Sequence, residues 1–305
     1  MLLGEPIEIS GTQTPAGGVV LTLDREIQQI TEDALDRSGF PRAAAVVLEI
    51  GSGAIRACVS RPDFDPNDVA AALNSRDAPF VNRAFSAFAV GSVFKPVLAA
   101  AAYAHGLEDF SWTCSGSVTV GGVTFHCPKE NGHGTMRLDS PAALANLSFG
   151  QGTLTATPLQ ICAMTAALAQ RGTRIDPYLI AGIRARDGAV TAAPQPATRS
   201  VISAEAAAEL CRALRRVVTD GSGRRAQSET VAIAGKTATA QTGRLRAGEE
   251  IYNAWFTGFF PADAPRYAVT VLVEDGGEGA VSCAPLVREI AERITAAETG
   301  EDPVR

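Results

Sequence analysis

The stretch Val90-Gly-Ser-Val-Phe-Lys-Pro96 places a serine and a lysine three positions apart at the start of an Ala-rich run. The run predicts a helix over residues 92–104, which ends near Gly106. On this helix, Ser92 and Lys95 would lie on one face, one turn apart and within reach of each other. The Ser92 hydroxyl would also lie at the positive end of the helix dipole, where backbone N–H groups lack partners within the helix.

This arrangement suits a serine nucleophile, which needs a nearby base and a donor for the oxyanion that forms on the attacked carbonyl. Lys95 is the candidate base. A lysine acts as a base only when it is neutral, and the apolar neighbours Val93 and Phe94 are expected to desolvate its amine and favour the neutral form. A helix start with a capping serine and a surface lysine has the same pattern, so the motif alone leaves both interpretations open.

A second candidate motif is Gly235-Lys-Thr-Ala-Thr-Ala240, inside a strand expected over residues 229–241. A lysine and a hydroxyl on a strand edge can bind a carboxylate and steer protons. An exposed strand with an ordinary surface charge is the alternative interpretation. The two motifs are more informative together than either is alone.

The predicted strands are grouped toward the two ends of the chain, with helices between them. The strands are expected over residues 43–50, 54–60, 229–241, 253–260 and 267–274, and helices are expected after Asp24 and over residues 92–104, 154–171, 204–219 and 284–297. Strands segregated from helices imply an α+β layered domain, in contrast to an alternating βαβ one. We expect five antiparallel strands in one sheet, the terminal helices packed on one face, and the middle helices as a second lobe.

The composition bounds the function. The chain has 305 residues, of which 46% are hydrophobic and 20% charged, so it can bury a sizeable core. A net charge of −6 argues against a nucleic-acid partner, which would favour clustered basic residues. The three histidines and six cysteines form no CxxC or HExxH pattern, so no metal site is expected.

The sequence leaves the compartment open. No apolar run reaches the roughly 18–20 residues that a membrane span needs, and the N-terminus lacks the layout of a signal peptide. The protein is therefore either cytoplasmic or exported by a segment outside this chain. Cys114 and Cys127 bracket a Gly-rich hairpin expected over residues 117–125, which could place them opposite each other. A disulfide and two free thiols both remain open, because spacing alone does not fix geometry.

Taken together, the two motifs resemble the transpeptidase domain of penicillin-binding proteins, the serine acyltransferases inhibited by β-lactams. Further segments look like this family and occur in its order, from about residue 20 to residue 297. They are Leu21-Thr-Leu-Asp24, Arg61-Pro-Asp-Phe-Asp-Pro-Asn67, Asn82-Arg-Ala84, Gly150-Gln-Gly-Thr-Leu-Thr-Ala-Thr-Pro-Leu-Gln160 and Asn253-Ala-Trp-Phe-Thr-Gly-Phe-Phe-Pro261. The class B, monofunctional branch is the most similar, since no glycosyltransferase-like region precedes these segments.

The resemblance implies a penicillin-binding transpeptidase or serine β-lactamase-like fold of the α+β class, with a five-stranded antiparallel sheet flanked by helices. Residues 1–20 would form an N-terminal lead-in and residues 21–300 the transpeptidase-like domain. The sheet would come from residues 43–60 and 229–275, and a shortened helical lobe from about residues 92–220.

The resemblance also implies the chemistry. Ser92 would attack the penultimate D-Ala carbonyl of a peptidoglycan stem peptide, release D-Ala and pass the acyl group to an amine on a neighbouring strand, with Lys95 as its base. Lys236 and Thr237 would bind the terminal carboxylate. The backbone N–H groups of Ser92 and Thr239 would form the oxyanion hole. This chemistry needs no cofactor and no metal.

The partners and location that the resemblance implies follow from this substrate. They are peptidoglycan stem peptides, β-lactam antibiotics as covalent ligands, and proteins of cell-wall synthesis or division, with no nucleic acid. The domain would act on the extracytoplasmic face of the bacterial cell membrane, anchored by a segment that this chain does not contain.

Two departures from the family pattern put the activity in doubt. The family's third motif, S-x-N, does not occur between Lys95 and Lys236. Gly132-His-Gly134 instead runs within a few residues into Ser140-Pro-Ala-Ala-Leu-Ala-Asn146, as if the intervening helices were missing. The other departure is Ala238, where the family usually has glycine. Period-two alternation puts Ala238 on the face of Lys236, so its methyl is expected to intrude on the substrate.

Impaired transpeptidation is therefore the leading interpretation, and two alternatives remain. A β-lactamase-like hydrolase would need an activated water, and no residue in the sequence is identified for that role. A non-catalytic or scaffolding relative of the same fold is favoured by the missing S-x-N motif.

Overall fold

The computed structural model describes residues 17–107, 117–120, 123–126, 150 and 154–300. Lys129, Cys114, Cys127 and Asn146 lie outside the described residues. Within them, no helix is long and apolar enough to cross a membrane.

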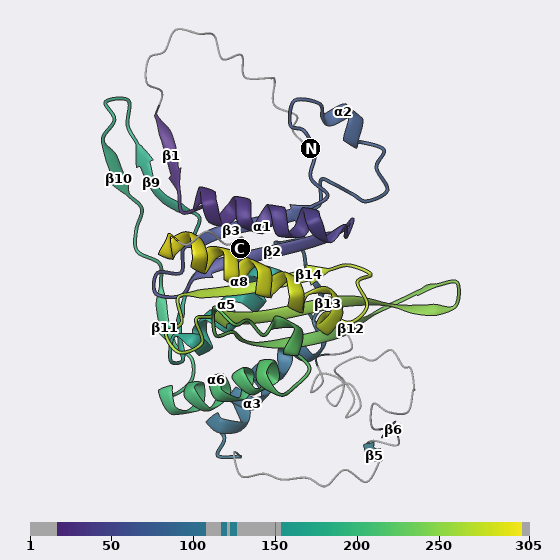
Figure 1. The fold of residues 1–305 in the computed structure, drawn as a ribbon. Coiled ribbons are helices and arrows are strands. Elements are labelled where there is room, and N and C mark those ends of the chain that lie inside the picture. The colour runs from purple at the N-terminus through teal and green to yellow at the C-terminus, as the bar shows by residue number, and fades with distance from the viewer. Residues whose placement is uncertain (1–16, 108–116, 121–122, 127–149, 151–153, 301–305) are drawn as a thin grey trace.

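A five-stranded antiparallel sheet in the order β12-β13-β14-β2-β3 forms the centre of the fold (Figure 1). Its strands are β2 (Ala43–Glu49), β3 (Ile55–Arg61), β12 (Ala234–Arg246), β13 (Glu249–Phe260) and β14 (Tyr267–Val273). The N-terminal hairpin pairs with the C-terminal meander through β2 and β14, which confirms the predicted sheet.

Strand β12 begins later than the sequence predicts. Residues 228–231 form a turn in which the Ser228 hydroxyl accepts hydrogen bonds from the N–H groups of Thr230 and Val231. A side chain that binds its own backbone in this way competes with strand pairing. The strand therefore starts at Ala234, and not near Glu229.

Two terminal helices, α1 (Arg25–Ser38) and α8 (Ala284–Thr299), cover one face of the sheet. The Asp24 carboxylate caps α1 by accepting from the N–H groups of Glu26 and Ile27, and Gly39 ends this helix with a φ of +71°. Helical spacing turns the apolar side chains of both helices toward the strands. They are Ile27, Ile30 and Leu35 of α1, with Leu286, Ile290 and Ile294 of α8.

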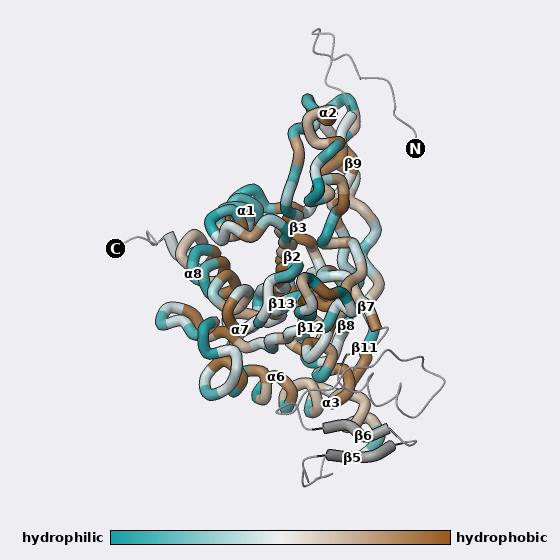
Figure 2. The backbone as a smooth tube through the Cα atoms, turned by 90° about the vertical axis from the view of Figure 1, so that its right-hand side faces the viewer, coloured by the Kyte–Doolittle hydropathy of each residue, from teal (hydrophilic) through white to brown (hydrophobic). Residues whose placement is uncertain are grey.

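Three other helices lie on the opposite side of the sheet from α1, as Figure 2 shows for α3 and α6. They are α3 (Lys95–Ala104), α5 (Pro158–Ala169) and α6 (Ala204–Thr219). Because both faces are covered, β2 is apolar without alternation from Ala43 to Leu48. Alternate residues of β2 therefore belong to two separate cores.

Helix α5 is shorter than the helix predicted over residues 154–171. Residues Thr155–Ala156 form β7, which pairs with β4 (Phe88–Ala89), so the helix cannot begin until Pro158. Thr157 and Gln160 form a reciprocal capping box at that point. The short β4–β7 pair ties the segment before Ser92 to the segment before α5.

The remaining elements lie outside the central sheet. Strand β9 (Ile180–Arg184) pairs with both β1 (Gly18–Leu21) and β10 (Val190–Ala192), and β8 (Thr173–Ile175) pairs with β11 (Thr198–Ser200). The sequence patterns predict none of the strands from β8 to β11. The hairpin of β5 (Ser117–Val120) and β6 (Val123–His126) is confirmed. Short helices are α2 (Val69–Ala72), η1 (Gly91–Phe94), η2 (Arg224–Ala226) and α7 (Gly279–Ser282).

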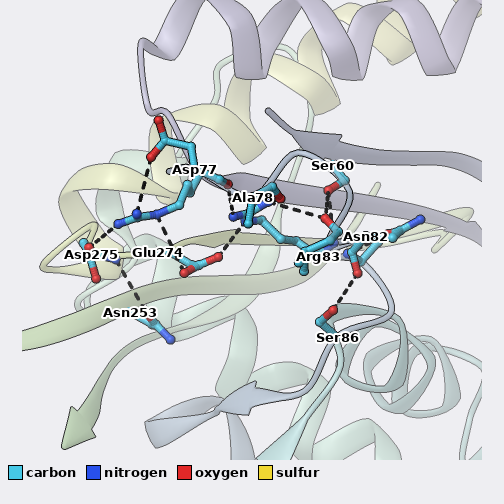
Figure 3. Close-up of polar contacts among 12 residues, drawn as sticks. Ser60, Asp77, Ala78, Asn82, Arg83, Ser86, Asn253, Glu274 and Asp275 are labelled. Carbon is cyan, nitrogen blue, oxygen red and sulfur yellow. Dashed lines mark hydrogen bonds and ion pairs between the residues drawn. The ribbon is translucent and has the colours of Figure 1, made fainter. Parts of the chain in front are cut away.

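Arg83 fastens the loop after β3 to the end of β14 (Figure 3). Its side chain is 3% exposed, and its Nε donates to Glu274 at 2.6 Å. The two Nη atoms donate to the carbonyls of Asp77 at 2.7 Å and Ala78 at 3.1 Å. The buried guanidinium thus has a carboxylate and backbone carbonyls as its partners.

The carboxylate of Asp275, the next residue, accepts hydrogen bonds from three further arginines. Arg42 donates to its carboxylate, as do Arg244 at 2.9 Å and Arg246 at 2.7 Å. Arg244 and Arg246 belong to β12, so the β12–β13 hairpin is held against the end of β14. The segment that leads to Ser92 and the β12–β13 hairpin of the second motif are therefore both held by Glu274 and Asp275. These two acidic residues and their arginines are called the ionic anchor below.

Arg83→Met should lower the free energy of unfolding by about 3 kcal/mol, because the change removes the nearest cation from Glu274 and the side-chain donors from the Asp77 and Ala78 carbonyls. Arg212→Met is the matched control. Its ion pair with Glu209 is exposed on both sides, and its loss should cost no more than about 0.5 kcal/mol. Urea unfolding of both variants measures the difference, and equal losses would contradict the anchoring role.

Candidate active site

Ser92 lies in a tight turn, and not in the first turn of an α-helix. Residues Gly91–Phe94 form the 3₁₀ helix η1, and α3 begins at Lys95. The N–H of Lys95 donates to the carbonyl of Ser92, so one turn separates the two residues, as predicted. The predicted helix start is wrong by three residues, because a 3₁₀ turn commonly precedes an α-helix.

The segment around Ser92 is held by contacts from three directions. The N–H of Gly91 donates to the carbonyl of Gly150 at 2.8 Å, and Trp255 Nε1 donates to the carbonyl of Ala89 at 2.9 Å. The buried side chains of Val90 and Val93 pack into one apolar cluster with Trp255. The Ser92 backbone is therefore fixed both by hydrogen bonds and by packing.

Strand β12 passes directly beside this turn. A Cβ on Gly91 would lie 3.1 Å from Ala240 Cβ and 3.2 Å from the Thr239 carbonyl oxygen. The φ of Gly91 is +58°, a conformation that favours glycine. The turn that carries Ser92 thus lies against the stretch of β12 that carries Thr239, which is the arrangement the proposed oxyanion hole would require.

Lys236 is half-buried in β12. Burial, and to a smaller extent the charge of Lys95, lowers the pKa of Lys236 to about 8. Its Nζ donates to the carbonyl of Thr237 at 2.7 Å. At neutral pH the side chain is mostly an ammonium, which suits a group that would bind a carboxylate.

Lys95 is exposed, so the expected desolvation by its apolar neighbours is wrong. Val93 and Pro96 are buried in the protein interior and leave the lysine uncovered. The side chains of Val93 and Pro96 point into the interior because of the 3₁₀ turn. The sequence patterns did not predict this turn. Lys95 nevertheless lies close enough to Lys236 for its charge to act on that residue.

Thr237 is buried at 6% exposure, and its Oγ1 lies 2.8 Å from the Oγ of Ser222. Ser222 lies in the turn after α6, and the sequence reasoning missed it. The sequence does carry a signal for a turn at this position. Glycines at 221 and 223 flank the serine, and the segment lies between a predicted helix and the second motif. Thr239 is exposed on the same strand.

Ala238 does not face an open substrate site. Its side chain is 3% exposed and packs in the cluster that contains Val90, Val93 and Trp255. The expected intrusion of its methyl on the substrate is therefore wrong. Alternation along β12 puts Ala238 on the face of Lys236, and residues of the turn that carries Ser92 cover that face at this position.

Next to Lys236, the sheet carries a row of buried hydroxyls. Lys236 is the register partner of Thr257, whose Oγ1 lies 2.7 Å from the hydroxyls of both Thr165 and Thr270. Thr165 also donates to the carbonyl of Ile161 at 3.0 Å. The row links α5 to β13 and β14 with polar contacts in which each of these three hydroxyls has a partner.

Metal ligands do not gather in the part of the chain that the structure describes, where no three His, Cys, Asp or Glu side chains form a group suited to an ion. The four described cysteines, Cys58, Cys162, Cys211 and Cys283, are free thiols.

Comparison with known proteins identifies the family. The penicillin binding protein transpeptidase domain matches residues 43–140 and 130–292. The crystal structure of penicillin binding protein 3 from Mycobacterium tuberculosis with aztreonam has a TM-score of 0.79 and 30% identity, and the match covers 93% of this chain and 80% of that one. The chain therefore belongs to the penicillin-binding protein transpeptidase family, and its α+β fold is that of the family.

Two curated relatives show the extent of the likeness. Penicillin-binding protein PbpB of M. tuberculosis is 31% identical over 351 aligned positions, which cover 90% of this chain and 51% of the relative. Peptidoglycan D,D-transpeptidase PbpA of Mycolicibacterium smegmatis is 28% identical, with 92% of this chain and 72% of the relative covered. The chain thus spans about half the length of PbpB. The PbpB alignment is longer than the 305 residues of this chain, so within the matched region the relative has residues that this chain lacks.

Ala238→Gly should lower the free energy of unfolding by about 1–2 kcal/mol, because it removes a buried methyl and adds a flexible residue to a strand. Ala247→Gly is the matched control. Ala247 is exposed in the turn between β12 and β13 with a φ of +51°, where glycine should be neutral or stabilising. Denaturant unfolding of both variants separates the effects, and a neutral Ala238→Gly would show that the methyl is not packed.

The half-buried Lys236 makes stability depend on pH. Because its pKa is about 8 in the folded protein against 10.5 for the free side chain, the unfolded chain binds more protons between these values. The free energy of unfolding of the wild type, relative to Lys236→Met, should therefore rise from about pH 8 to about pH 10.5, by on the order of 2–3 kcal/mol. Urea unfolding of both proteins across this range is the measurement. A flat difference would mean that Lys236 is not desolvated.

Proposed function

We propose that this chain is a penicillin-binding D,D-transpeptidase domain that forms an acyl-enzyme on Ser92 during peptidoglycan cross-linking. The observation that carries the proposal is the close packing of the turn that holds Ser92 against β12, next to the edge that holds Lys236, Thr237 and Thr239. Family membership supports it. A similar solved structure, 25% identical to this chain, is an imipenem acyl-enzyme complex of penicillin-binding protein A from M. tuberculosis, which supports it further.

In the proposed reaction, Ser92 Oγ forms a bond to the penultimate D-Ala carbonyl carbon of a stem peptide and gives its proton to Lys95 Nζ, which can accept it only in those molecules whose Lys95 amine is neutral. The carbonyl oxygen becomes an oxyanion that the N–H groups of Ser92 and Thr239 stabilise. The bond to the terminal D-Ala then breaks, and its nitrogen takes the proton. An amine from a second stem peptide attacks the ester, which forms the cross-link and restores the Ser92 hydroxyl.

Lys236 and Thr237 would hold the terminal carboxylate of the donor peptide. A carboxylate beside Lys236 favours its ammonium form and offsets the repulsion from Lys95. Substrate binding would therefore stabilise the charge that burial disfavours in the free protein. A β-lactam with its own carboxylate would enter the same place and acylate Ser92 covalently.

The stem peptide also implies a location. We infer that the domain acts at the extracytoplasmic face of the bacterial membrane, with cell-wall synthesis or division proteins as partners.

A non-catalytic relative of the same fold is the second candidate. The missing S-x-N motif favours it, since this motif would supply a proton-shuttling serine and an asparagine for the substrate amide. A complete failure of the wild type to form a covalent adduct with any β-lactam would support this candidate over the first.

Ser92→Ala should abolish covalent labelling by a fluorescent penicillin and leave the free energy of unfolding within about 1 kcal/mol of the wild type, since it deletes only the attacking oxygen. Ser86→Ala is the control, because Ser86 is a half-buried serine six residues away and its variant should label normally. Gel fluorescence and intact mass are the readouts. Labelling that survives in Ser92→Ala would identify another nucleophile.

Acylation of the wild type should be slow. Loss of one proton-shuttling or substrate-orienting group typically lowers a rate by about 10²–10⁴-fold, and the S-x-N motif would supply both kinds. The second-order rate constant for a reporter penicillin, measured beside a class B enzyme with all three motifs, tests this. Equal rates would mean that another residue performs the role of the missing motif.

A further inference from the structure

The turn after α6 holds Ser222 in a fixed position beside the second motif. The N–H of Gly221 donates to the carbonyl of Arg216 at 3.0 Å, and the N–H of Gly223 donates to the carbonyl of Val217 at 2.8 Å. A Cβ on either glycine would lie 3.0 Å from the Val217 carbonyl oxygen. Glycine is favoured on both sides of the serine because the turn presses directly onto the last turn of the helix.

Buried residues secure this turn on both sides. Val218 precedes it in α6 and Ala226 follows it in η2, and both are fully buried in the core that also contains α1 and α8. Ser222 itself is exposed. The Ser222 hydroxyl is therefore exposed to solvent, while buried residues before and after Ser222 fix its backbone.

The partner of this hydroxyl is Thr237 Oγ1, at 2.8 Å. Two hydroxyls in contact have two hydrogens, and only one of them lies between the oxygens. The other is free to point outward, whichever hydroxyl supplies the inner one. The Ser222–Thr237 pair is thus a ready donor to an anion. Because Thr237 is buried and Ser222 exposed, an anion that enters from solvent meets Ser222 first.

We propose that Ser222 is a further substrate-binding residue, which accepts the hydrogen of the Thr237 hydroxyl and donates its own hydrogen to the carboxylate of the donor peptide or β-lactam. This inference rests on the proposed function and adds a residue from outside its two motifs. A carboxylate has lone pairs for several donors, so the Lys236 ammonium and the hydroxyl pair can bind it together.

The test compares two reporter penicillins, one with its free carboxylate and one in which that group is a methyl ester. Ser222→Ala should lower the second-order acylation rate constant for the acid by about 10-fold, which is the loss of one hydrogen bond to a charged group. The rate constant for the ester should change little, so the acid-to-ester ratio should fall. Ser222→Thr, which keeps the hydroxyl, should restore most of the ratio.

Ser228→Ala is the matched control. Ser228 also pairs its hydroxyl with a threonine, Thr230 at 3.1 Å, but it lies in the turn before β12 and its variant should leave both rate constants unchanged. Equal losses for acid and ester in Ser222→Ala, or an unchanged ratio, would overturn the role of Ser222 while acylation at Ser92 still supports the proposed function. No adduct on the wild type with either penicillin would overturn both.

Discussion

The turn that carries Ser92 and the edge strand β12 are nearly in backbone contact. The approach is possible because only small residues lie between them: a Cβ on Gly91 would lie 3.1 Å from Ala240 Cβ. The apolar cluster around Trp255, the Trp255 hydrogen bond to Ala89 and the short β4–β7 pair all maintain this distance. A larger residue at Gly91 would move the serine away from the strand with which it is proposed to work.

The ionic anchor at Glu274 and Asp275 extends this constraint to the loop after β3 and to the β12–β13 hairpin. Arg83 holds the loop that leads toward Ser92, and Arg244 and Arg246 hold the β12–β13 hairpin to the same pair of acidic residues. The loop after β3 and the β12–β13 hairpin, which are far apart in the sequence, therefore contact the same two acidic residues. The order of the sheet explains why, since β14 lies between the N-terminal hairpin and the rest of the C-terminal meander.

Much of this fold could be predicted from the sequence, because its signals are local. Asp24 and Gly39 bound α1, Ser203 caps α6, and apolar runs mark β2 and β14 of the sheet. The errors have tertiary causes. The exposure of Lys95 and the burial of Ala238 both depend on a 3₁₀ turn packed against β12, and the contact of Ser222 with Thr237 joins two elements whose distance no spacing rule provides.

The scarcity of lysine has a consequence for chemical probing. Arginine supplies every cation of the ionic anchor, and the whole chain contains only three lysines, of which Lys95 and Lys236 lie at the candidate site. Ammonium groups do not react with acylating reagents, whereas a neutral amine does. Because the pKa of Lys236 is about 8, near that pH about half of its amines are neutral, a far larger share than an ordinary surface lysine offers. An amine-directed tag would therefore attach to few places on this protein, and the site of proposed catalysis holds two of them.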